Sequence, residues 1–108
     1  MTAAETSDVI SPQQAVTLHG LFLERVRRTP DKIAYSYFDT RQSVWVDLSW
    51  DQMREQVARW QVALAREGLA KGDRVAIMLR NCPQWVMFDR AAMSLGLAVV
   101  PLYTVDRA

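Results

Sequence analysis

The sequence has very little cysteine, histidine and glycine, and each shortage excludes a kind of site. Its single cysteine, Cys82, cannot form an internal disulfide or supply a thiolate pair for zinc. Its single histidine, His19, has no Cys, His or carboxylate cluster beside it, so we interpret it as structural. The glycines, at positions 20, 68, 72 and 96, are too scattered for a Gly-rich phosphate-binding loop. We therefore predict no catalytic, cofactor-binding or metal-binding residue in this chain.

Long apolar runs and an excess of one charge are also missing. No run approaches the roughly 20 apolar residues that a membrane-spanning helix needs. Thirteen Lys and Arg against twelve Asp and Glu leave a charge of +1, which does not favour nucleic acid as a partner. Residues 1–16 lack the basic and apolar parts of a secretory signal, and we predict that they form a flexible leader. The single cysteine is consistent with a cytoplasmic location.

The sequence from Thr17 to Gly68 predicts a helix, a β-hairpin and a second helix. Apolar residues recur at helical spacing after Thr17: Leu18, Leu21, Phe22 and Val26. Alternation then predicts two strands, the first with Ile33, Tyr35 and Tyr37 on one face and Ala34 and Ser36 on the other. Ser49 and Gln52 have the spacing of a capping box that starts the second helix. Its apolar stripe is Trp50, Met53, Val57, Trp60 and Leu64, Glu55 can pair with Arg59, and Gly68 ends it.

The second half predicts a right-handed βαβ unit. Residues 74–79 form a short apolar strand whose two faces should both be covered. Asn81 or Cys82 can cap a helix that has Pro83 in its first turn. We expect the main stripe of that helix to be Trp85, Phe88, Ala92 and Leu95. Residues 97–102 form the second strand. Because two parallel strands are not a stable sheet alone, we predict an α/β fold that is an incomplete piece of a larger layered domain, occupying residues 17–108.

Five further residues, at three places in the sequence, could carry chemistry, and we weigh each place against a structural role. Cys82 beside Pro83 has no plausible partner base, so packing or capping is the better interpretation. Asp89 and Arg90 lie on a mostly apolar helix and are expected to pair with a neighbouring element. Tyr103 and Thr104 follow a strand at its carboxyl end, where open α/β sheets bind ligands. They are the one place where the fold favours a ligand.

Two stretches resemble the core motifs of adenylate-forming enzymes. Residues 48–53, LSWDQM, resemble the first motif, L-T/S-Y-x-E-L, with Trp, Gln and Met in place of Tyr, Glu and Leu. Residues 94–103, SLGLAVVPLY, are similar to the second, in which a helix end, a glycine, a strand and a proline follow one another. The sequence between them resembles the bacterial long-chain fatty-acid–CoA ligases, and the resemblance extends over residues 17–108.

The resemblance implies an AMP-forming acyl-CoA synthetase as the parent enzyme. Such enzymes use ATP and magnesium to convert a carboxylic acid, here a fatty acid, into an acyl-adenylate, and then transfer the acyl group to coenzyme A. Their phosphate loop, ribose-binding acidic segment and C-terminal lysine have no counterpart in these 108 residues. We therefore expect an N-terminal scaffold that is inactive alone and binds none of these cofactors. We expect the parent enzyme to be cytoplasmic, and peripheral attachment of the parent to a membrane is an alternative that stays open.

Two other functions remain open from the residues alone. The first is a self-contained α/β interaction or regulatory module without ligase activity, which would bury its own apolar surface. A scaffold piece should instead expose apolar patches, to be covered by the rest of the parent chain or by another copy. The second is a small nucleotide-binding protein, against which the absence of a glycine fingerprint argues.

Overall fold

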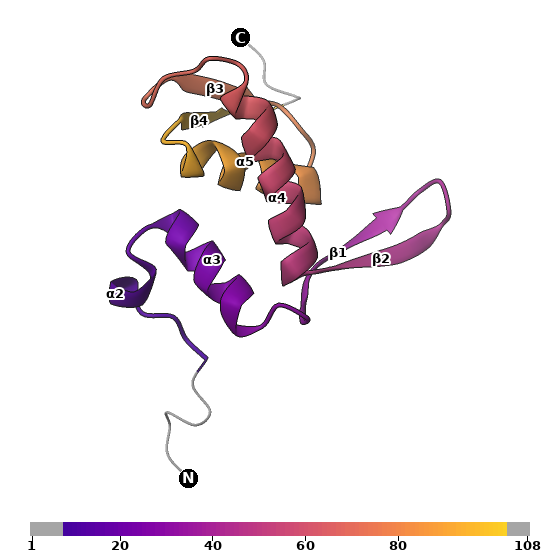
Figure 1. Cartoon of the computed structure of the whole chain (residues 1–108). Helices are drawn as coiled ribbons and strands as arrows, with labels where there is room; N and C mark the ends of the chain where they lie inside the picture. The colour runs from indigo at the N-terminus through magenta and orange to yellow at the C-terminus, as the bar shows by residue number, and fades with distance from the viewer. Residues whose placement is uncertain (1–7, 104–108) are drawn as a thin grey trace.

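The computed structural model describes residues 8–103, and its elements follow the predicted α/β order (Figure 1). A short helix and a longer one, α2 (Pro12–Ala15) and α3 (Leu18–Arg28), precede the hairpin of β1 (Ile33–Asp39) and β2 (Val44–Ser49). The second half contains α4 (Trp50–Ala65), β3 (Arg74–Ile77), α5 (Pro83–Ser94) and β4 (Ala98–Pro101). The leader predicted over residues 1–16 lies partly outside the described residues, and its flexibility stays a prediction; residues 12–15 are helical.

The core lies among the three longer helices, and α4 is its centre. Its buried side chains are Phe22, Val26, Met53, Val57, Met87 and Ala91. Met53 is completely buried, and Trp50, Trp60 and Leu64 pack against the same cluster, so the predicted stripe of α4 is confirmed. From α3 the core receives only Phe22 and Val26, because Leu18 and Leu21 are 55% and 40% exposed.

The start of α4 is as predicted, but its surface ion pairs are not. Ser49 Oγ accepts from the Gln52 amide at 3.1 Å, and Gln52 Oε1 accepts from the Ser49 amide at 2.8 Å. This reciprocal pair is the expected capping box. The Glu55–Arg59 pair does not form within the described residues. Arg54 is the partner instead, at 2.9 Å from Asp51 and 4.0 Å from Glu55, because Asp51 lies one turn before it on the same face.

The buried face of α5 differs from the predicted stripe. Pro83, Met87, Ala91 and Ala92 are buried, whereas Trp85, Phe88 and Leu95 are only half-buried. The helix is apolar on several faces, so its periodicity could not fix which face turns toward α4. The small side chains of Ala91 and Ala92 face inward, and Phe88 forms an edge contact with Trp60, with ring centroids 5.7 Å apart.

The hairpin is antiparallel, but a β-bulge interrupts its alternation. Ile33 is opposite Ser49 while Tyr35 is opposite Leu48, so the register shifts between the two pairs. As a result Ala34 and Tyr35 both pack against the core, and Ile33 is 60% exposed. The prediction that Ile33 and Tyr35 share a face is wrong for this reason. Figure 1 shows the hairpin projecting from the base of α4.

The second sheet has two parallel strands, with Arg74 opposite Ala98 and Ile77 opposite Pro101. The expected strand through Leu79 ends at Ile77, and Met78 and Leu79 are 59% and 45% exposed. The prediction that both faces are covered is therefore wrong: Ile77 is buried and α5 packs against β4, but Ala76 is exposed and no third strand pairs with this sheet among residues 8–103. The right-handed crossover stays a prediction. Across the same residues no helix is both long and apolar enough to cross a bilayer.

Candidate functional site

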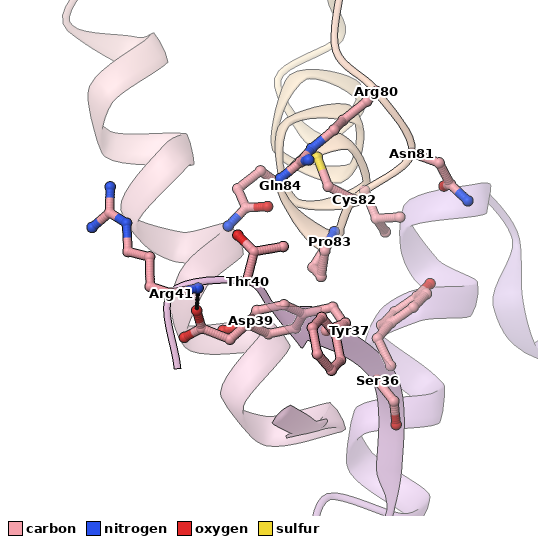
Figure 2. Close-up of a pocket in the computed structure, with 13 residues that line it drawn as sticks. Ser36, Tyr37, Asp39, Thr40, Arg41, Arg80, Asn81, Cys82, Pro83 and Gln84 are labelled. Atoms are coloured by element: carbon pink, nitrogen blue, oxygen red, sulfur yellow. Dashed lines mark hydrogen bonds between the residues drawn. The ribbon is translucent and has the colours of Figure 1, made fainter. Parts of the chain in front are cut away.

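A hollow lined by polar and apolar side chains lies after the end of β3, between the hairpin and the start of α5 (Figure 2). We call it the hairpin pocket. Its volume is about 750 Å³. It is lined by Tyr35, Ser36, Tyr37, Phe38, Asp39, Thr40, Arg41, Arg80, Asn81, Cys82, Pro83, Gln84 and Val86. The pocket is therefore built at the carboxyl end of a parallel strand, the edge at which open α/β sheets bind ligands.

The α5 side of the hairpin pocket is formed by the turn that leads into this helix. Cys82 is the N-cap residue with an extended backbone, and Pro83 follows at the first helical position. The sequence predicts that Asn81 or Cys82 caps α5. Cys82 does occupy the N-cap position, but its side chain makes no capping hydrogen bond. The thiol is free and half-buried. Within residues 8–103 no imidazole or carboxylate is hydrogen-bonded to it, which favours the packing interpretation.

The hairpin side is built around the carboxylate of Asp39. Asp39 Oδ1 accepts from the backbone amides of Arg41 and Gln42 at 2.9 and 3.3 Å. The Asp39 carboxylate therefore stabilises the turn of the hairpin. Figure 2 shows the Arg41 side chain extending away from Cys82 and Gln84. Among the described residues no three His, Cys, Asp or Glu side chains gather as metal ligands would. The pocket can accept hydrogen-bonding groups, but it has no nucleophile with an activating base.

His19 is packed as a structural ring. It stacks on Phe22, with ring centroids 6.3 Å apart, and its Nδ1 atom is buried without a hydrogen-bond partner within residues 8–103. Burial, with a smaller effect of the Arg90 charge, lowers the pKa of His19 below its usual value. The lowered pKa favours the neutral form of the imidazole.

The remaining singled-out residues do not converge on one site. Asp89 and Arg90 pair with each other at 2.6 Å, and Arg90 also donates to the Leu18 carbonyl at 3.3 Å. The expected ion pair to a neighbouring element is thus wrong, because the adjacent carboxylate satisfies the guanidinium first. Tyr103 is 74% exposed beyond β4, and Thr104 lies outside the described residues.

Reasoning from sequence missed Arg80 and Tyr37, which line the hairpin pocket from two different elements. The rule that directed attention to the end of β4 applies equally to the end of β3 and could have singled out Arg80. Tyr37 had no comparable signal, because its place beside α5 depends on how the hairpin packs.

Comparison with known proteins gives a consistent assignment. The family model of AMP-binding enzymes matches residues 22–107. A long-chain-fatty-acid–CoA ligase of Bacillus subtilis (strain 168) is 35% identical over 91 residues, which are 82% of this chain and 15% of the relative. Acetoacetyl-coenzyme A synthetase of Rhizobium meliloti (strain 1021) is 36% identical over 69 residues, which are 64% of this chain and 9% of the relative.

A solved structure has the same fold. The crystal structure of CmiS6 aligns with a TM-score of 0.80 and 26% identity, covering 94% of this chain and 25% of that one. The chain thus spans less than a sixth of the two curated relatives and a quarter of this structure. Since the family model covers most of its residues and its motifs occur in the family's order, the chain belongs to the AMP-binding enzyme family.

Proposed function

We propose that this chain is the N-terminal scaffold of a ligase that activates a fatty acid with ATP and transfers the acyl group from the acyl-adenylate to coenzyme A. The observation that carries the proposal is the family match over residues 22–107. In this role the 108 residues supply packing and position, and the chemistry is supplied by other parts of the enzyme. ATP, magnesium and coenzyme A are the cofactors of that enzyme.

The geometry supports a scaffold role in preference to a catalytic one. The hairpin pocket has no nucleophile with a base, and the described residues have no metal-ligand cluster. The second sheet leaves Met78, Val100 and Leu102 at least 41% exposed. A domain complete in itself would bury such side chains, so this surface favours a scaffold over a self-contained interaction module.

A fatty acid is proposed as the substrate because the Bacillus subtilis relative is named for that acid class. The Rhizobium meliloti relative, of similar identity, is named for acetoacetate, so the choice of a fatty acid is more specific than the family assignment. The residues that select the acid lie elsewhere in the enzyme.

The proposal is tested with the protein that contains this sequence in its full length and with the 108-residue chain. The full-length protein should release pyrophosphate from ATP in the presence of magnesium and a long-chain fatty acid, and form the acyl-CoA when coenzyme A is added. Release with acetoacetate but not with a long-chain acid would contradict the substrate. Release by the 108-residue chain would contradict the scaffold role.

A further inference from the structure

A second hollow lies between α3 and α5, and it adjoins the hairpin pocket, with which it shares Tyr35 and Val86. We call it the aromatic groove. Its volume is about 470 Å³, and Phe22, Tyr35, Trp50 and Trp85 line it together with leucines of α3. Phe22 and Tyr35 each make an edge contact with Trp50, at 6.2 and 5.9 Å between ring centroids. Arg25, Asp89 and Arg90 also line the groove, and its apolar part gains free energy when it is covered.

The N-terminal segment supplies one wall of this groove. Ile10 lines it, although the segment precedes α3 in the chain. Ile10 is half-buried, whereas its neighbour Val9 is 79% exposed. We call residues 8–16 the strap. Only one apolar side chain at the start of the strap is turned toward the groove, so the covering contact is small.

Ionic contacts hold the start of the strap against α3. Arg25 is the main anchor: its Nη1 lies 2.5 Å from Asp8 Oδ2, and its Nη2 donates to the Asp8 carbonyl at 2.5 Å. Arg28 adds a longer ion pair of 3.7 Å to Asp8 and donates to the Val9 carbonyl at 3.4 Å. Arg25 also lines the aromatic groove. The Arg25 guanidinium therefore both pairs with Asp8 and lines the space that the strap covers.

The other end of the strap is seated tightly on the first turn of α3. A Cβ atom added at Gly20 would stand 1.9 Å from the Ala15 carbonyl oxygen, so only glycine allows this approach. Between α2 and α3, Val16 has a φ of +66°, an uncommon conformation for a β-branched residue. The strap thus turns at one strained residue and is held at both ends.

From these contacts we propose that residues 8–16 form a latched strap: the Asp8 contacts to Arg25 and Arg28 hold Ile10 over the aromatic groove, and releasing them uncovers the groove. The latch is electrostatic and partly exposed to solvent, so salt weakens it, whereas the Ile10 contact does not depend on salt. Strap opening is a local motion that leaves the α4–α5 core folded.

Hydrogen–deuterium exchange of the 108-residue chain tests the latch. Asp8→Asn and Arg25→Gln should each raise the exchange rate of residues 14–17 about two- to fivefold, and leave the α4 amides unchanged. Asp51→Asn is the matched control, because it removes another exposed Asp–Arg pair, at 2.9 Å, far from the strap in sequence. Raising the salt concentration should speed exchange in the wild type and have no further effect in Asp8→Asn. Equal rates in wild type and Asp8→Asn, or an equal effect of Asp51→Asn, would overturn the proposal.

A second pair of variants tests the apolar contact and the groove. Ile10→Ala should speed exchange of the strap at low and at high salt, whereas Val9→Ala, at the exposed neighbouring position, should not. Hydroxyl-radical labelling reports the groove directly: labelling of Trp85 should increase about two- to fivefold in Asp8→Asn, and labelling of Trp45, already 70% exposed, should stay constant. Unchanged labelling of Trp85 alongside faster strap exchange would show that the strap moves without covering the groove, and would overturn the proposal.

Discussion

The side-chain amide of Gln61 donates a 2.8 Å hydrogen bond to the Ser94 hydroxyl, which ties the later turns of α4 and α5 together. The hydroxyl in turn donates to the Ala91 carbonyl at 2.6 Å. We expect Ser94→Ala to lower the free energy of unfolding by about 0.5–1.5 kcal/mol, because a partly buried amide loses its acceptor. Urea unfolding followed by tryptophan fluorescence measures this. Ser36→Ala, which breaks an exposed bond to Asp47, should cost less; an equal cost would contradict a special role for the interhelical bond.

Met53 anchors the core from α4. It is completely buried, so Met53→Ala should leave a cavity and lower the free energy of unfolding by about 2–5 kcal/mol. Val62→Ala is the control on the same helix, at a position that is 52% exposed, and should change the free energy by less than about 0.5 kcal/mol. The measurement is the midpoint of urea unfolding. Similar midpoints for the two variants would show that α4 does not pack through the face described.

Glu24 makes the chain sensitive to acid. Hydrogen bonds from Arg27 and then Arg28 lower the pKa of its carboxyl from 4.5 to about 2. Because the pKa is lower in the folded state, the stabilisation is complete above pH 4.5 and is lost as the pH falls toward about 2. Glu24→Gln should therefore be less stable than the wild type at pH 7, and the difference should disappear near pH 2. A pH-independent difference for Glu24→Gln would contradict the assignment.

Gly96 combines a left-handed backbone with a close neighbour. Its φ is +73°, and a Cβ atom there would lie 2.7 Å from Lys71 Cγ. Gly68 has nearly the same φ, +72°, with open space around it, so Gly68→Ala isolates the backbone cost of about 1–2 kcal/mol. We expect Gly96→Ala to cost more than this, as measured by thermal unfolding. Adding Lys71→Ala to Gly96→Ala should remove the excess, and an undiminished excess would contradict a steric origin.

Much of the fold could be predicted from the sequence, because local signals agreed with one another. The capping box at Ser49 and the helical spacing from Trp50 to Leu64 both indicated α4, and the structure has both. The face of α5 could not be predicted, because that helix is apolar on several sides and only the packing of Met87 and Ala91 against α4 selects one. The bulge after Ile33 could not be predicted either, since it depends on the pairing with the partner strand.

The sequence by itself determined the family, the order of helices and strands from Leu18 onward, and the absence of a phosphate loop or cysteine pair in these 108 residues, because motifs and composition are properties of the chain alone. Only the tertiary structure decided which side chains meet across the molecule. It placed Arg80 and Tyr37 around one pocket and brought Asp8 to Arg25 over the aromatic groove. The physical reason is that contacts between distant residues follow from helix rotation and strand register, which neighbouring residues in sequence do not specify.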